Sequence, residues 1–197
     1  MPPSDASTVP AAPMPWPAHT RLLMLLLNLV PLGHAAVVLW IGCAWSWLGA
    51  IACLYLLPPL MLRMLLLASP FSHGTHALGT RAFLHWWASS QPQVIFSRLP
   101  FLEELLRLVP GLYSLWLRLW GSHIGRLTYW APGVRVMDRS LLQIGDDVVF
   151  GAGARLSAHV VSSNAEEQAV LHLGAIVVGD RCRIGAYALL SPGAVVD

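Results

Sequence analysis

The hydrophobic residues of this chain follow two different patterns in its two halves. Near the N-terminus the sequence is almost continuously apolar, and no Asp, Glu, Lys or Arg lies between Arg21 and Arg63. As a single helix rising about 1.5 Å per residue, this stretch would be roughly twice as long as the hydrocarbon core of a bilayer. It predicts a transmembrane helical hairpin within residues 21–68, with one helix at 22–41 and the other at 46–67.

The flanks of this hairpin predict its orientation. Tryptophans gather near the break at residues 42–47, where interfacial aromatic side chains are expected. Arg21 lies before the first helix, and the next arginines, Arg63, Arg81 and Arg98, lie near or beyond the end of the second. Because the connecting turn is uncharged, both ends are expected in the cytoplasm and the chain in the inner membrane. The alternative is one span plus one buried or re-entrant segment, broken by Pro31 and Gly33 or by Pro58 and Pro59.

In the C-terminal part, at residues 121–197, the apolar residues instead recur every six positions. A helix repeats near 3.6 and a half-buried strand alternates by two, so neither produces this period. It is typical of a hexapeptide parallel β-helix, in which six residues form one side of a triangular coil and small residues permit the corners. A two-layer β-sandwich would need hairpin turns between alternating strands. The residues predicted to point inward are Ile124, Trp130, Val136, Ile144, Phe150, Leu156, Val178, Ile184, Leu190 and Val196.

The six-residue pattern is interrupted twice. It slips by two residues between Val136 and Ile144, and it is lost over RLSAHVVSSNAEEQAV, residues 155–170. His159 stands where the longer interruption begins. We therefore expect a loop that leaves the coil there and shapes a pocket, with His159 at its root.

Two further segments complete the predicted organisation. Residues 1–20 are rich in proline and are expected to be a disordered tail rather than a cleaved signal peptide. Residues 69–120 predict short helices, two of them separated at Pro110-Gly111, which either lie on the bilayer surface or cap the domain that follows. The expected apolar faces of these two helices are Leu102, Leu105, Leu106 and Val109, and Leu112, Leu115, Trp116 and Leu119.

Composition narrows the possible functions. The net charge is +2 and no cluster of Lys or Arg is present, so nucleic acid is not an expected partner. The three cysteines have no CxxC spacing and predict neither a zinc site nor a disulfide framework. His123 and His159 precede and follow their nearest inward residues by different spacings, so they would not stack, and no metal is expected.

The C-terminal part resembles the hexapeptide-repeat acyltransferases, whose domain is a left-handed parallel β-helix. The resemblance covers residues 121–197 and is carried by IGRLTYWAPGVRV, QIGDDVVFGAGARL and VVGDRCRIGAYALLSPGAVV. In sugar and serine O-acetyltransferases of that group a loop interrupts the coil beside the catalytic histidine, as the stretch at 155–170 does here. The resemblance implies CoA-dependent transfer of an acyl group, in the first place acetyl, to a hydroxyl or amine of a small-molecule, glycan or peptide acceptor at the membrane.

Site residues follow from this resemblance. It implies that His159 is the catalytic base, a role that suits a side chain titrating near neutral pH. Ser157 and Asn164, polar residues of the same interruption, are candidates for binding the acceptor. Acetyl-CoA or another acyl-CoA would run along the coils after the loop and bind to backbone groups near Gly185, Ala186 and Ser191.

Assembly and a different class of function remain open at this stage. The group forms trimers, and the last coil ends at Asp197 without a cap, so we expect it to be covered by a homotrimer partner or by a further β-helix segment. The alternative function is a non-catalytic β-helix scaffold subunit of a membrane complex. A scaffold has no need of His159 and its loop.

Overall fold

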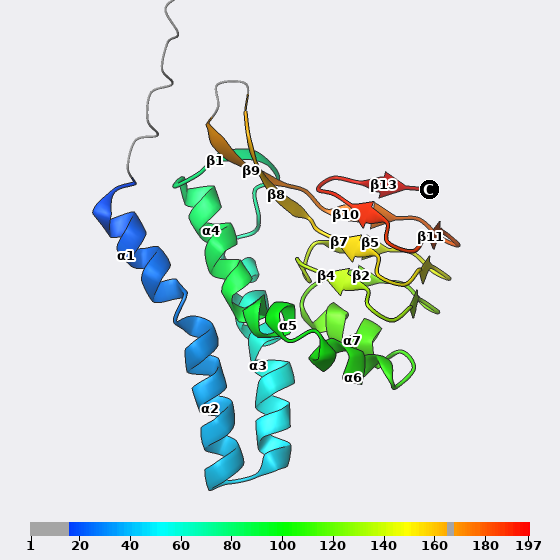
Figure 1. Cartoon of the computed structure of the whole chain (residues 1–197), viewed down its shortest axis with the longest axis horizontal. Helices are drawn as coiled ribbons and strands as arrows, with labels where there is room; N and C mark the ends of the chain where they lie inside the picture. The colour runs from blue at the N-terminus through cyan, green and yellow to red at the C-terminus, as the bar shows by residue number, and fades with distance from the viewer. Residues whose placement is uncertain (1–15, 165–167) are drawn as a thin grey trace, which may run out of the picture.

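The structure is a computed structural model that describes residues 16–164 and 168–197, and it consists of a helical N-terminal part followed by short strands in parallel sheets (Figure 1). The expected tail at 1–20 lies outside the described residues as far as residue 15. Its last three residues, from Ala18, already belong to the first helix.

Three apolar helices form the predicted hairpin. Helix α1 (Ala18–Leu27) continues into α2 (Val30–Ala44), and α3 (Trp47–Ala68) returns beside α2 after a turn at Trp45 and Ser46. Ala18–Ala44 and Trp47–Ala68 are both long and apolar enough to cross a membrane, and the turn lies where the sequence predicts it. The two prolines within α3 do not end the helix.

Short helices link this hairpin to the strands, and two of them are separated at Pro110-Gly111 as predicted. Gly111 adopts a left-handed conformation, with φ +78°, which glycine tolerates without steric cost. The linking elements are β1 (Gly74–Ala77), α4 (Arg81–Ser90), the 3₁₀ helix η1 (Gln91–Gln93), α5 (Val94–Arg98), α6 (Phe101–Arg107) and α7 (Leu112–Leu119).

Helix α7 packs on the first strands, so this segment caps the domain that follows it. The predicted apolar faces need correction. Trp116 and Leu102 are buried as expected, but Leu105, Val109 and Leu115 are exposed. Because α7 is apolar on more than one side, its contact with the strands selects a neighbouring face, formed by Tyr113, Ser114, Trp116 and Leu117.

The remaining strands wind into a three-sided coil. Successive strands join different sheets, and each pairs in parallel with a strand one turn later, in the orders β13-β10-β5-β2, β11-β6-β3 and β12-β7-β4. The strands are β2 (His123–Ile124), β3 (Tyr129–Trp130), β4 (Arg135–Val136), β5 (Leu142–Ile144), β6 (Val149–Phe150), β7 (Arg155–Leu156), β10 (Ile176–Val178), β11 (Arg183–Ile184), β12 (Leu189–Leu190) and β13 (Val195–Val196).

The ten predicted inward residues form the core of this coil. Nine are buried and Val196, in the last strand, is partly buried. Equivalent residues pair from coil to coil, for example Ile124 with Ile144 and Val136 with Leu156. The rings of Trp130 and Phe150 stack with centroids 4.5 Å apart and planes 7° apart. The six-residue pattern therefore predicts the core correctly.

The longer interruption is an antiparallel hairpin that leaves the coil. Its strands are β8 (His159–Ser163) and β9 (Ala169–Leu173), and residues 165–167 between them lie outside the described part. Strand β1 adds to the outer side of β9, pairing Gly74 with Leu173. This link between the end of the apolar helices and the β8–β9 hairpin is not predicted from the sequence.

Candidate active site

The two interruptions of the six-residue pattern meet at one corner of the coil. Val136 and Leu156 are paired in neighbouring strands, and the Met137 N–H donates to the Leu156 carbonyl at 2.9 Å. Asp138 follows the first of these strands and His159 follows the second. Each interruption therefore contributes one polar side chain from consecutive coils.

These two side chains form a hydrogen-bonded pair. Nδ1 of His159 lies 2.7 Å and 2.9 Å from the two carboxylate oxygens of Asp138. The Asp138 side chain is 4% exposed and the His159 side chain 24% exposed. A carboxylate at Nδ1 holds the proton on that nitrogen and leaves Nε2 as the acceptor. Nε2 forms no hydrogen bond with any residue that the structure describes.

Trp86 of α4 fixes this pair from the side. Its indole Nε1 donates to Asp138 Oδ1 at 3.4 Å, and its ring centroid lies 4.6 Å from that of His159. The contact restricts rotation of the imidazole and shields the carboxylate from water. The helical part thus supplies one wall of a site whose reactive groups come from the coil.

A pocket of 430 Å³ opens beside the pair, between the coil and the segment α4–α5. Its lining combines two indole rings, several side chains that form hydrogen bonds, and one exposed arginine, so it can bind a polar ligand with a flat or apolar portion. The lining residues are Trp86, Trp87, Ser90, Gln93, Val94, Ser97, Arg98, Met137, Asp138 and His159.

A buried polar cluster holds the backbone next to Asp138. The Arg139 side chain, 1% exposed, forms an ion pair with Glu103, and the Arg139 N–H donates to Gln93 Oε1 at 2.8 Å. The Tyr113 hydroxyl donates to Glu103 at 2.8 Å, and burial together with the nearby Glu103 carboxylate raises the pKa of Tyr113 well above its ordinary value. Every charge in this cluster has a partner, so the corner is rigid as well as buried.

Only some of the other predicted site residues lie near His159 in the structure. Ser157 Oγ donates to the His159 carbonyl at 2.7 Å, and the Ser157 N–H donates to the Leu190 carbonyl at 2.9 Å, which places Ser191 beside Ser157 on the next coil. Asn164 lies at the far end of the hairpin, where its side chain accepts from the Gln168 N–H at 2.8 Å. The structure brings Ser157 and Ser191 to the histidine corner and leaves Asn164 outside it.

Gly185 and Ala186 follow β11 and lie at a different corner of the coil. The coils are tightly stacked there, since a side chain at Gly151 would come within 2.6 Å of the Ala186 nitrogen. Gly185 itself has open space around it. These two residues offer an accessible backbone on the outside of the coil rather than a place in the pocket beside His159.

Sequence reasoning misses Asp138 and Trp86. The two-residue slip after Val136 is the signal that could have identified Asp138. This slip and the later interruption that begins near His159 occur at the same corner of consecutive coils, so an acidic residue in the first can face the histidine in the second. Trp86 gives no such signal, since its position depends on how α4 packs on the coil.

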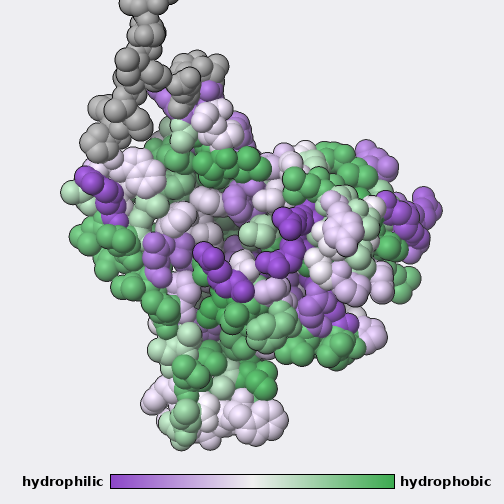
Figure 2. All heavy atoms as spheres, viewed as in Figure 1, coloured by the Kyte–Doolittle hydropathy of each residue, from purple (hydrophilic) through white to green (hydrophobic). Residues whose placement is uncertain are grey.

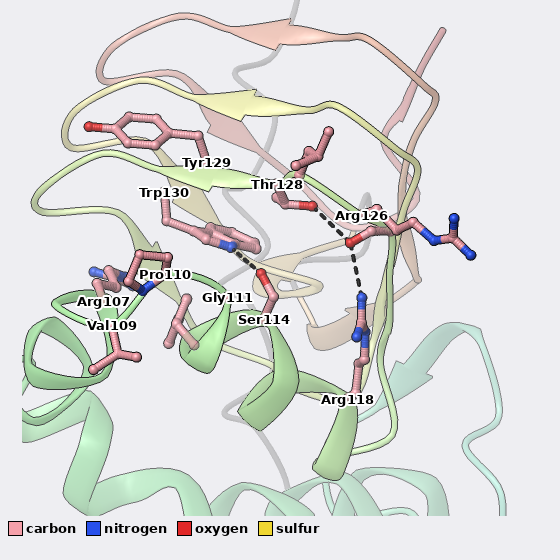
Figure 3. Close-up of a pocket in the computed structure, with 13 residues that line it drawn as sticks. Arg107, Val109, Pro110, Gly111, Ser114, Arg118, Arg126, Thr128, Tyr129 and Trp130 are labelled. Atoms are coloured by element: carbon pink, nitrogen blue, oxygen red, sulfur yellow. Dashed lines mark hydrogen bonds between the residues drawn. The ribbon is translucent and has the colours of Figure 1, made fainter.

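A second pocket of 570 Å³ lies between the α6–α7 loop and the corner from Gly125 to Trp130 (Figure 3). Its hydrogen bonds are structural: Trp130 Nε1 donates to Ser114 Oγ at 2.9 Å, and Arg118 donates to the Gly125 carbonyl at 3.1 Å. Its lining, as far as the structure describes it, includes no imidazole or carboxylate that could accept a proton. The His159 pocket is therefore the better candidate for chemistry.

Within residues 16–164 and 168–197, no group of three or more His, Cys, Asp or Glu side chains is arranged to hold a metal ion. The pair of His159 and Asp138 is an acid–base arrangement.

The fold and site thus describe a protein with a parallel-stranded coil and a histidine–carboxylate pair at one corner. No family model matches the sequence, and no curated protein matches it. A similar solved structure is that of a hexapeptide-repeat-containing acetyltransferase from Vibrio cholerae, with 13% sequence identity and a TM-score of 0.32. The match covers 53% of this chain and 80% of that one. A likeness at this level carries no information about activity.

Proposed function

We propose that this chain is a membrane-attached acyltransferase whose coil is a left-handed β-helix, and that it transfers an acyl group from coenzyme A to a hydroxyl or amine. The observation that carries the proposal is the pairing of His159 with the buried Asp138 at the wall of a pocket. An imidazole whose Nδ1 is held by a carboxylate presents Nε2 as a general base.

The reaction balances with these residues alone. As the acceptor oxygen or nitrogen attacks the thioester carbonyl, Nε2 of His159 takes its proton, and the Asp138 carboxylate stabilises the resulting imidazolium. The tetrahedral intermediate then breaks its carbon–sulfur bond, and the departing CoA thiolate receives the proton back from His159. The acyl group ends on the acceptor and free CoA leaves.

The pocket provides positioning for the acceptor. Trp86 and Trp87 can pack against an apolar or flat face, while the exposed Arg98 can bind an anionic group. Holding the acceptor beside Nε2 converts a bimolecular attack into one within a complex, which is where much of the rate enhancement arises.

The acyl-CoA is proposed to lie along the coils, as the family resemblance implies. Ser191 stands on the coil next to Ser157, so a thioester bound there would end near the histidine corner. Gly185 and Ala186 would bind more distant parts of the pantetheine arm through their backbone groups. Ser157 would contribute polarity near the acceptor.

Membrane attachment gives the helical part its role. The two apolar helices would hold the coil at the cytoplasmic face, where acyl-CoA is available, and would confine the enzyme to the surface that presents its acceptor. A homotrimer partner or a further β-helix segment would cover the last coil.

The test is binding of acetyl-CoA to the detergent-purified chain by isothermal calorimetry, followed by turnover with a panel of hydroxyl and amine acceptors. We expect His159→Ala to retain acetyl-CoA binding and to lose turnover by roughly a hundredfold or more. The matched control is His123→Ala, an exposed histidine in strand β2. If no CoA thioester binds to wild type, the chain is not such an enzyme, and the scaffold hypothesis takes its place.

A further inference from the structure

We infer that the helical hairpin enters only one leaflet of the bilayer, at a slant, with the turn at Trp45 and Ser46 held inside the hydrocarbon. This inference rests on the membrane attachment proposed above and is independent of the chemistry at His159. It replaces the expectation of two complete transmembrane passes.

The first argument is the length of helix that stands clear of the rest of the molecule. The Tyr55 carbonyl accepts a hydrogen bond from Trp116 Nε1 at 2.8 Å, and the Tyr55 hydroxyl donates to the Leu102 carbonyl at 2.8 Å. From Trp47, where α3 begins, to Tyr55 the helix rises only about 12 Å. The hydrocarbon core is about 30 Å thick, so the free end of the hairpin reaches less than half of it.

The second argument is the charge of the residues that lie beside α3 from Tyr55 onward. Leu102 precedes Glu103, which forms the buried ion pair with Arg139 and a further one with Arg107. Nearer the end of α3, Arg63 donates to the Arg118 carbonyl at 3.1 Å. A complete crossing by α3 would carry these charges, and the coil beside them, to bilayer depth at a large free-energy cost.

The arrangement of elements agrees with partial insertion. The coil lies beside the upper part of the hairpin, whereas the turn between α2 and α3 projects beyond α6 and α7 (Figure 1). This projecting part, together with the side of α1 and α2 that faces away from the coil, can enter lipid without immersing the strands, whose exposed edges carry unpaired backbone groups.

The third argument is the distribution of exposed apolar side chains. They surround the turn, where Trp45 is 78% exposed, and continue from it along α3 to Leu67, which is 73% exposed; they also follow one side of α1 and α2 from Leu22 to Leu32, which is 66% exposed. Figure 2 shows this apolar surface on the side of α1 and α2 away from the coil. A slanted hairpin places both regions in one leaflet. The exposed residues along α1 and the start of α2 repeat at helical spacing, namely Leu22, Leu25, Leu29 and Leu32.

The charges of this half favour a lipid surface over a second copy of the chain. The sequence has no Asp or Glu between Asp5 and Glu103, and every charge in that interval is an arginine. The four arginines are exposed, and anionic headgroups attract such residues at the membrane surface. They are Arg21, Arg63, Arg81 and Arg98.

Single cysteines in the full chain test the depth of the turn. Cys43, Cys53 and Cys182 are first replaced by alanine, and Ser46→Cys or Trp45→Cys is then introduced. The control is Val195→Cys, an exposed position in the last strand of the coil. Sealed membrane vesicles of both orientations are treated with a membrane-impermeant maleimide, before and after solubilisation in detergent.

We expect Val195→Cys to be labelled from one face, and the turn cysteines from neither face until detergent is added. A bimane probe on Ser46→Cys should be quenched more strongly by lipids carrying a spin label deep in the acyl chain than by those labelled at the headgroup. Labelling of the turn from the face opposite Val195→Cys would establish a spanning hairpin and overturn the inference, while leaving the acyltransferase proposal intact. Labelling of both positions from the same face would show that the turn is not inserted, and release of the chain by alkaline carbonate would remove membrane attachment altogether.

Discussion

Asp138 and His159 are 21 residues apart in the sequence, yet the carboxylate of one lies 2.7 Å from Nδ1 of the other. The coil produces this contact, since the strands that precede them are paired in parallel, Val136 against Leu156. Trp86 packs against one side of the pair, and the buried ion pair of Arg139 with Glu103 holds the residue that follows Asp138. The base that we propose is thus already held in position before a ligand binds.

The role of Asp138 can be separated from that of a merely structural carboxylate. Asp138→Asn retains the shape of the side chain but can no longer hold the Nδ1–H tautomer or stabilise the imidazolium. We expect kcat to fall by roughly 10²–10⁴-fold with the acetyl-CoA dissociation constant unchanged. The measurements are steady-state kinetics and calorimetry.

Asp147→Asn is the matched control, because Asp147 is an exposed carboxylate of the same coil, 3.4 Å from Arg183. It should leave kcat within the error of wild type. Equal kcat values for Asp138→Asn and wild type would show that Asp138 does not position the base.

The buried ion pair between Glu103 and Arg139 predicts a large loss of stability when one partner is removed. Glu103→Gln leaves the Arg139 guanidinium buried without a counter-charge, which should lower the free energy of unfolding by about 3–5 kcal/mol. Breaking the exposed pair with Arg183→Ala should cost less than about 1 kcal/mol. Thermal unfolding in detergent compares the two, and similar midpoints would contradict the prediction.

Gly153 occupies a position that a side chain cannot fill without a shift. Its φ is +69°, and an added Cβ would lie 2.7 Å from the Tyr187 ring. Gly153→Ala should therefore destabilise the chain by about 1–3 kcal/mol, and Tyr187→Ala in the same chain should recover only the part that comes from the clash.

Gly185→Ala serves as the comparison, since Gly185 has open space around it and no positive φ. Its midpoint of unfolding should match wild type. A loss as large as that of Gly153→Ala would mean that the effect comes from glycine flexibility in general rather than from the Tyr187 contact.

The stability of the chain should depend on pH through His85. Burial lowers the pKa of His85 below its ordinary value near 6.5, and its Nε2 is buried without a hydrogen-bond partner among the described residues. The unfolded chain therefore binds the proton more tightly. Protonation of His85 therefore does not reduce the free energy of unfolding above about pH 6.5. The free energy of unfolding decreases as the pH falls from there toward the lower pKa that His85 has in the folded state. His85→Phe should lose less stability than wild type between pH 7 and pH 5, and parallel thermal-unfolding curves would contradict this assignment.

The core of the coil is predictable because it depends on a local rule. Each inward residue occupies the same place on a six-residue side, so Phe150 or Ile184 can be assigned without knowing which coil lies next to it. The interruption within 155–170 is predictable for the same reason, as a place where the rule stops, whereas the antiparallel pairing of β8 with β9 is not.

The carboxylate partner of His159 depends on information that is not local. Whether Asp138 faces that histidine is decided by the number of residues in each turn of the coil, and by the slip that lets an acidic residue leave the regular path. Trp86 depends further on the packing of α4, which no periodicity specifies. The position of β1 cannot be predicted from the sequence either. Its residues Gly74–Ala77 pair with residues almost a hundred positions later and carry no turn or strand signal of their own.

The pairing of β1 with β9 also sets an order of events during synthesis. Gly74 leaves the ribosome long before Leu173 is made, so the segment after the apolar helices must wait with its backbone groups unpaired. Contacts of such high sequence separation form slowly, and an unpaired strand invites association with other chains. The site around His159 is therefore among the last parts of the chain to fold. A substitution that disrupts β9 should first lower the yield of folded protein.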